Sequence, residues 1–113
     1  MRDNQKLIGM LGLAMRAGKV IIGTEQVCIS LSKKKIPLVL VSTGASDGTK
    51  KKICCKCEFY SIPLIEVDID TDELGRLLGK TYTPAVIGIA DDNFARVISE
   101  LAAPQLKRKG IHC

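Results

Sequence analysis

The chain alternates between two spacings of apolar residues. Leu7, Leu11 and Ala14 lie three or four positions apart, the spacing of a helix that packs one face on a sheet. Residues 38–41 are instead a continuous aliphatic run, which is typical of a strand buried on both faces. We expect helices over about residues 5–17, 24–34, 49–60, 70–79 and 91–102, and strands over residues 20–22, 38–41, 64–67 and 85–90.

This order of elements predicts an α/β fold, a three-layer α/β/α sandwich around a mostly buried sheet. A length of 113 residues fits one domain with one core. We expect that domain to span residues 1–104. Residues 105–113 include Lys107, Arg108 and Lys109, and we expect them to form a basic, flexible tail.

The most distinctive local feature is a helix that opens on Gly23 and Thr24 directly after an apolar strand. The first N–H groups of a helix have no partner within it and carry the positive end of its dipole, so an anion can dock there. Gly23 keeps the approach clear, and Thr24 can cap the helix. Glu25 and Gln26 follow in the first turn, where a carboxylate and an amide can reach the edges of unpaired or sheared bases. An ordinary capped helix start fits the same residues.

Further stretches of the chain join this one in a resemblance to a known family. Residues 16–19 are Arg-Ala-Gly-Lys, residues 49–52 are Thr-Lys-Lys-Lys, residues 73–80 are Glu-Leu-Gly-Arg-Leu-Leu-Gly-Lys, and residues 83–89 are Thr-Pro-Ala-Val-Ile-Gly-Ile. Together with residues 23–26, and over most of its length, the chain resembles the ribosomal protein L7Ae/L30e family of kink-turn RNA-binding proteins. The resemblance is greatest to the small bacterial L7Ae-like members.

The resemblance implies an L30e-like fold with a mixed four-stranded sheet and a non-catalytic, ribosome-associated protein that recognises a bent, structured RNA of the kink-turn type. Its implied partners are that RNA and ribosomal or other RNA-processing proteins. In the family, the helix after the glycine enters the widened groove of the RNA bend, and the loop before the last strand covers the extruded nucleotide. Antiparallel first and last strands would bring both segments to one edge. The implied RNA-binding residues are Gly23, Thr24, Glu25, Gln26, Thr83, Pro84, Ala85 and Val86, with Arg16 and Lys19 beside them as phosphate contacts.

The chain departs from the archaeal and eukaryotic family pattern, Gly-Thr-Asn-Glu-x-x-Lys. Glu25 and Gln26 stand at the Asn-Glu positions, and Ile29 replaces the Lys. Ile21 and Ile22 precede the Gly, where the family pattern has basic residues. These changes remove phosphate contacts and allow a different RNA bend as the target. They also fit a second class of function, a protein-interaction or docking module with weak RNA affinity. Contiguous exposure of the three isoleucines would favour that module, and burial of all three would favour RNA binding.

The charge balance fits a polyanionic partner. Seventeen Lys and Arg residues against twelve Asp and Glu residues give a net charge of +5, which favours RNA through counterion release. The chain has no Trp, and its few Phe and Tyr residues form no aromatic ladder along the sequence. Recognition of RNA shape is therefore expected rather than a platform for single strands.

Little in the sequence supports catalysis or a metal centre. The single histidine, His112, lies in the expected tail, away from any rigid scaffold for a Ser–His or Cys–His pair. Cys54 and Cys57 have the spacing of one helical face, but no second pair of ligands has the spacing of a zinc site. We therefore expect no catalytic residue, no metal and no cofactor. A thiolate at neutral pH on Cys54 or Cys57 would instead favour a third class, a thiol-dependent redox protein.

Cysteine usage and apolar runs bear on the compartment. Five cysteines, three of them within residues 54–57, fit a reducing environment. No apolar run is long enough to span a bilayer, and the first residues lack a signal-peptide core. We expect a cytoplasmic protein without a membrane partner.

Overall fold

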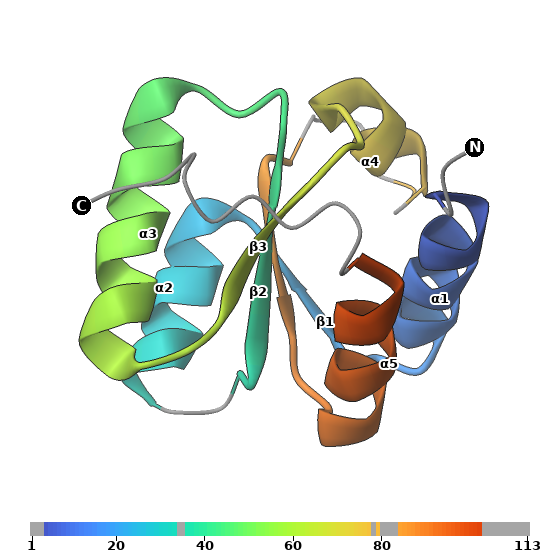
Figure 1. Ribbon diagram of the computed structural model, residues 1–113, viewed down its shortest axis with the longest axis horizontal. Coiled ribbons are helices and arrows are strands. Elements are labelled where there is room, and N and C mark those ends of the chain that lie inside the picture. Colours follow the sequence, from blue (N-terminus) through green and yellow to red (C-terminus); the bar gives the residue numbers. More distant parts are fainter. Residues whose placement is uncertain (1–3, 34–35, 78, 80–83, 103–113) are drawn as a thin grey trace.

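The expected α/β architecture is confirmed by the computed structural model, which describes residues 4–33, 36–77, 79 and 84–102. Thr83, His112 and the expected tail over residues 105–113 lie outside the described residues. Helices and strands alternate along the described chain (Figure 1). The helices are α1 (Asn4–Arg16), α2 (Thr24–Ser32), α3 (Asp47–Tyr60), α4 (Thr71–Leu77) and α5 (Asp92–Ala102), and the strands are β1 (Val20–Ile22), β2 (Leu38–Ser42), β3 (Leu64–Val67) and β4 (Val86–Ile89).

The strands form one mixed sheet in the order β1-β4-β2-β3. β2 and β3 are parallel, whereas β4 runs antiparallel to both of its neighbours, β1 and β2. The first and last strands are therefore adjacent and antiparallel, as expected. One end of the sheet consequently gathers the last residues of β1, β2 and β3 and the first residue of β4. We call this end, marked by Gly23, Ser42, Val67 and Val86, the upper end (top of Figure 1).

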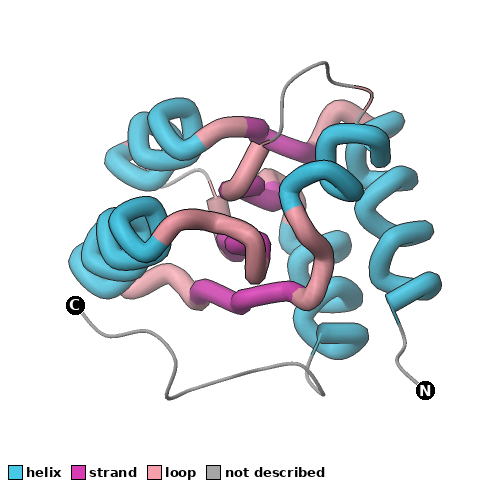
Figure 2. Tube along the Cα trace, turned by 90° about the horizontal axis from the view of Figure 1, so that it is seen from above, coloured by secondary structure: helices cyan, strands magenta, loops and turns pink. Residues whose placement is uncertain are grey.

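Helices cover both faces of the sheet, which makes the three layers visible from above (Figure 2). α1 and α5 pack together on one face, and α2 and α3 pack together on the other. Successive residues of a strand point to opposite faces, so Leu38 and Leu40 join the first core while Val39 and Val41 join the second. Burial on both sides explains why residues 38–41 are aliphatic without interruption.

Helix starts differ from the sequence-based expectation because other residues cap them. α3 starts earlier than expected because the Oγ of Ser46 accepts a hydrogen bond from the backbone N–H of Thr49, at 3.2 Å. Thr71 has the residue type that the sequence suggests as the cap of α4, but it is already helical. Asp70 caps that helix instead, its Oδ1 accepting from the N–H of Glu73 at 2.8 Å. Both caps supply an acceptor to a first-turn N–H group that the helix itself leaves unpaired.

None of the helices within the described residues is long and apolar enough to cross a membrane.

Candidate nucleic-acid interface

The upper end of the sheet brings together the two segments that the sequence singled out. Beyond the last register pair of β1 and β4, the N–H of Gly23 donates to the carbonyl oxygen of Val86 at 3.0 Å. On the other side of β4, the N–H of Ser42 donates to the carbonyl oxygen of Ala85 at 2.9 Å. The start of β4 is thus held between β1 and β2, directly beside the first turn of α2.

Gly23 adopts a backbone conformation that other residues rarely adopt. Its φ is +105° and its ψ is 143°, a region that L side chains avoid and glycine enters without steric cost. A Cβ placed at this position would meet no atom of the described residues within 4 Å. Glycine is therefore required by the backbone, while the space in front of it is open, as the sequence predicted.

α2 begins without a side-chain cap. Its N-cap is Gly23, which has no side chain, and the expected cap by Thr24 is wrong because Thr24 is the first helical residue. The carbonyl oxygen of Gly23 accepts from the N–H of Val27 at 2.9 Å. The N–H groups of Thr24, Glu25 and Gln26 precede that bond, and the geometry of a helix gives them no acceptor one turn back. They carry the positive end of the α2 dipole.

The side chains around this helix start divide the interface into a polar and an apolar part. Glu25 and Gln26 are exposed and Thr24 is half-buried, so a carboxylate and an amide stand in solvent beside the uncapped N–H groups. Pro84 is buried and Ala85 is half-buried. Pro84 and Ala85 therefore form a mostly buried apolar segment without charged groups, which we call the wall before β4.

Arg16 and Lys19 lie at the other end of β1. Lys19 immediately precedes the strand, its carbonyl oxygen accepting from the N–H of Ala90, which follows β4, at 2.8 Å. A strand rises roughly 3.3 Å per residue, so Lys19 is about 13 Å from Gly23 along the sheet. Both basic residues are exposed. The structure does not gather them with the start of α2.

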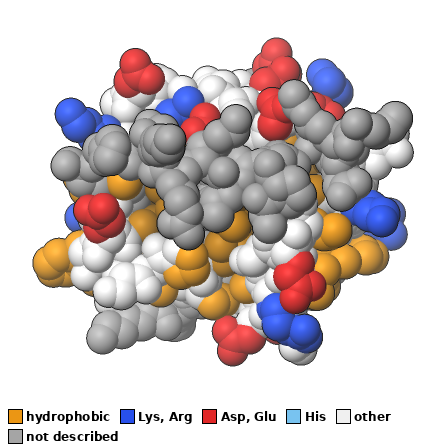
Figure 3. Space-filling view, in the orientation of Figure 1, with side chains coloured by type: hydrophobic (Ala, Val, Ile, Leu, Met, Phe, Trp, Pro, Cys, Tyr) orange, Lys and Arg blue, Asp and Glu red, His pale blue; other side chains and the backbone are white. Residues whose placement is uncertain are grey.

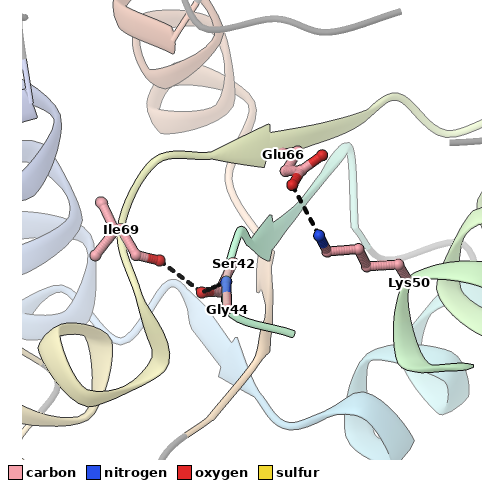
Figure 4. A network of polar contacts seen from close by, with 5 residues as sticks. All are labelled: Ser42, Gly44, Lys50, Glu66 and Ile69. Carbon is pink, nitrogen blue, oxygen red and sulfur yellow. Dashed lines mark hydrogen bonds and ion pairs between the residues drawn. The ribbon is translucent and has the colours of Figure 1, made fainter. Parts of the chain in front are cut away.

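A buried serine that sequence reasoning missed organises the upper end (Figure 4). Ser42 is fully buried; its hydroxyl donates to the carbonyl oxygen of Ile69 at 2.6 Å and accepts from the N–H of Gly44 at 2.9 Å. With its own N–H on Ala85, this residue joins the loop after β2, the segment before α4 and the start of β4. The sequence feature that could have indicated this role is a serine placed directly after the aliphatic run of residues 38–41 and directly before the loop that begins at Thr43.

One of the lysines at the start of α3 has a partner that the sequence did not reveal. The Nζ of Lys50 lies 3.0 Å from the Oε2 of Glu66 on β3, and both side chains are largely shielded (Figure 4). Lys50 is thus offset by a carboxylate of the protein, while Lys51 and Lys52 are exposed to solvent.

Comparison with known proteins identifies the family. The sequence model of the ribosomal protein L7Ae/L30e/S12e/Gadd45 family matches residues 5–99 of this chain. The chain belongs to this family. It is 37% identical over 99 residues to the "RNA-binding protein YlxQ" of Enterococcus faecium, an alignment that covers 88% of this chain and 93% of the relative.

Two further similarities connect this L7Ae-family chain to a ribosomal protein and to a solved structure. It is 33% identical over 95 residues to the "Large ribosomal subunit protein eL30" of Sulfolobus acidocaldarius, covering 84% of this chain and 91% of that protein. A protein of unknown function from Bacillus halodurans has the same fold, with a TM-score of 0.80 and 38% identity over 87% of this chain and 97% of that one. Membership of the L7Ae family also confirms the expected non-catalytic class.

The isoleucines proposed as the mark of a docking module are not one surface in this L7Ae-family chain. Ile21 packs against the core under α2 and α3, whereas Ile22 packs against the core on the opposite face of the sheet. Only Ile29, with 48% of its surface exposed, faces solvent freely among the three. A contiguous apolar rim, the condition stated for a protein partner, is therefore not met, and neither is burial of all three.

Cys57 of α3 lacks the property that would mark a redox site. Cys54 and Cys57 are both buried. Burial, together with the smaller effects of the neighbouring Cys54 and Cys28, raises the pKa of Cys57 to about 12. Cys57 is therefore a protonated thiol at neutral pH. Across the residues that the structure describes, no group of His, Cys, Asp or Glu is arranged to hold a metal ion.

Proposed function

We propose that this chain is an RNA-binding protein that recognises a bent, structured RNA of the kink-turn type at the start of α2. The observation that carries the proposal is the uncapped first turn of α2, held by the Gly23–Val86 hydrogen bond beside the segment that precedes β4. Relatives that cover nearly the same length are named RNA-binding or ribosomal proteins, which supports RNA as the ligand.

The charges at this helix start favour base edges over phosphates. The N–H groups and the helix dipole attract negative charge, but the exposed carboxylate of Glu25 in the same turn repels a phosphate. A carboxylate accepts hydrogen bonds from exocyclic amino groups of bases, and the Gln26 amide both donates and accepts. The first turn is thus suited to unpaired or sheared bases in a widened groove. Arg16 and Lys19, at the other end of β1, would contact phosphates farther along the same RNA.

The wall before β4 gives the second part of the proposed interface. Ala85 exposes part of its apolar surface beside the buried Pro84 and Val86, and Thr83 precedes them in sequence. Such a wall can cover an extruded nucleotide, because an unstacked base needs an apolar surface in place of its lost neighbours. Interfaces of this kind recognise shape, which agrees with the lack of an aromatic ladder.

The proposal extends to the setting of the protein. The eL30 relative is named as a protein of the large ribosomal subunit, and we place this chain with ribosomal or similarly structured RNA. The cysteine pattern favours the reducing cytoplasm as its compartment.

Fluorescence anisotropy with two labelled RNAs tests the proposal. One RNA is a kink-turn with an internal loop between two stems; the other is the same sequence repaired to a continuous duplex. Recognition of the bend predicts binding to the kink-turn stronger by roughly tenfold or more, the equivalent of one lost base contact or more. Equal affinities that fall together with salt would mean a basic protein without bend recognition.

A further inference from the structure

The outward face of α3 combines exposed lysines with an exposed aromatic ring. The side of α3 opposite the core carries Lys52, Lys56 and Phe59, which are four and three residues apart and so lie on one stripe of the helix. Lys51 is exposed beside them, and Glu58 is the acidic residue exposed in the same part of the helix. Figure 3 shows basic side chains above an apolar projection on the side of the molecule formed by α3.

The lysines of this stripe form no ion pair within the described part of the chain. Lys50, one position before them, pairs with Glu66. Among the residues that the structure describes, no carboxylate lies within ion-pair distance of Lys51, Lys52 or Lys56. Lys52 and Lys56 are four residues apart on the helix, and like charges at this spacing repel each other. A polyanion on this face would relieve the charge repulsion.

Phe59 is the more unusual member of the stripe. It is 79% exposed, more than the other large apolar side chains exposed in the described chain, Leu13 at 51% and Ile29 at 48%. Its ring forms a T-shaped contact with Tyr60, at 4.9 Å between centroids and an interplanar angle of 90°. Tyr60 itself packs against the core under α2 and α3. The exposed ring is therefore positioned by a neighbour that is anchored.

The helix that carries the stripe begins at the same end of the sheet as the proposed RNA interface. α2 and α3 pack side by side on the same face of the sheet, and both begin at its upper end (Figures 1 and 2). With 1.5 Å of rise per residue, Lys52 and Phe59 are roughly 10 Å apart along the α3 axis. A strand that leaves an RNA bound at the start of α2 can pass over these residues in order.

We infer that the outward face of α3 binds unpaired nucleotides flanking the RNA bend, with phosphates on Lys52 and Lys56 and a base stacked on Phe59. This rests on the proposed function, because it needs the bend at the start of α2. It differs from the ladder that the sequence argues against, since one ring can hold only one base. Phosphate contacts and stacking are both tolerant of sequence, so the contact adds affinity for a single-stranded flank rather than specificity for its bases.

Binding to kink-turn RNAs with and without an oligouridine tail tests the inference. For the unchanged protein, a tail on one of the two strand ends should strengthen binding by about tenfold, the effect of one stacked base. Phe59→Ala should remove that gain and leave the affinity for the tailless RNA unchanged. Lys52→Ala and Lys56→Ala should each lower the salt slope by about 0.7 on the tailed RNA only.

Matched controls lie on the opposite helical layer. Leu13→Ala removes an exposed apolar side chain from α1, and Lys6→Ala removes an exposed lysine from the same helix. Both should retain the full gain from the tail, and circular dichroism should show all variants folded, because each altered side chain is exposed.

The outcomes separate the two proposals. Failure of the unchanged protein to distinguish the kink-turn from the duplex refutes the proposed function and this inference with it. Binding of the bend with no gain from either tail refutes the inference alone. A gain from the tail that survives Phe59→Ala also refutes it, and if sedimentation then shows that this variant reduces self-association, the face is a contact between proteins.

Discussion

Two helices on the same face of the sheet begin in opposite ways. The first turn of α3 is capped by a side chain, because the Oγ of Ser46 accepts a hydrogen bond from the N–H of Thr49. α2 starts on Gly23, which offers no side chain to its first turn. Asp70 and Asp91 cap α4 and α5 in the same manner as Ser46, so α2 differs from the three helix starts that follow it in the described chain.

The difference separates a structural helix start from one suited to a ligand. A side-chain cap satisfies a first-turn N–H group and typically stabilises by about 1 kcal/mol relative to Ala. Gly23 forgoes that cap, but its positive φ allows the chain to leave β1, bond to Val86 and turn directly into α2. An incoming group can therefore approach the first turn without displacing a cap. Four predictions test this contrast.

The largest effect is expected for Gly23→Val. A β-branched residue at φ +105° is strained by on the order of 1–3 kcal/mol, and its side chain occupies the open approach. Affinity for the kink-turn should fall by roughly tenfold or more, since at least one base contact is lost. Urea unfolding and anisotropy measure the two effects separately.

Gly18→Val is the matched control for strain. Gly18 also has a positive φ, +72°, and a Cβ there would meet no described atom within 4 Å, but Gly18 lies between α1 and β1. It should lose comparable stability and retain the preference for the kink-turn over the duplex, with a loss of affinity limited to the phosphate contacts of the neighbouring Arg16 and Lys19. If both valine variants lose binding in proportion to their stability, the start of α2 has no special role.

Gln26→Ala should reduce selectivity while leaving the fold unchanged. The amide is exposed in the first turn of α2, so its removal leaves no cavity. Loss of a base contact should lower the preference for the kink-turn over its duplex by roughly 1–3 kcal/mol. A variant that discriminates the two RNAs as well as the unchanged protein would exclude a base contact from Gln26.

Ser46→Ala should produce the converse result at α3. Removing the cap leaves the Thr49 N–H without its side-chain acceptor and should lower the free energy of unfolding by about 1 kcal/mol. Affinity for the tailless kink-turn should not change, because this start is closed in the folded protein. A loss of RNA binding without a loss of stability would reverse the roles assigned to the two helices.

The smallest effect is expected for Ile29→Lys, which restores the lysine of the family pattern. Ile29 is 48% exposed on α2, so a lysine fits without repacking the core. One added phosphate contact should steepen the slope of log K against log salt by up to about 0.9 and raise the affinity. An unchanged slope would place this turn of α2 away from the RNA.

The strands and their order along the chain were predictable, because the spacing of apolar residues and the residue types of a segment directly reflect its burial. β1 and β3 match the expected residues, and the run of residues 38–41 is buried on both faces as its composition indicated. The family pattern correctly paired the first and last strands. These features depend on the local sequence or on the resemblance, and neither requires knowledge of individual side-chain contacts.

Caps and long-range polar contacts were not predictable in the same way. Thr24 and Thr71 have the residue type of a cap, but one position of shift places each of them inside its helix. The partners of Ser42 and Lys50 lie 27 and 16 positions away along the chain. The separation of Lys19 from Gly23 follows from the strand between them, which residue types at a site do not reveal.

The contrast between the two helix starts is tested most directly by nuclear magnetic resonance of the backbone amides. Isotopically labelled protein is titrated with the tailless kink-turn RNA, and the shifts of the N–H groups are followed. The largest changes should fall on Thr24, Glu25 and Gln26, while Thr49 and Lys50 in the first turn of α3 should move little. Large shifts at the start of α3 with none at residues 24–26 would contradict the assignment of the α2 start as the RNA-binding site.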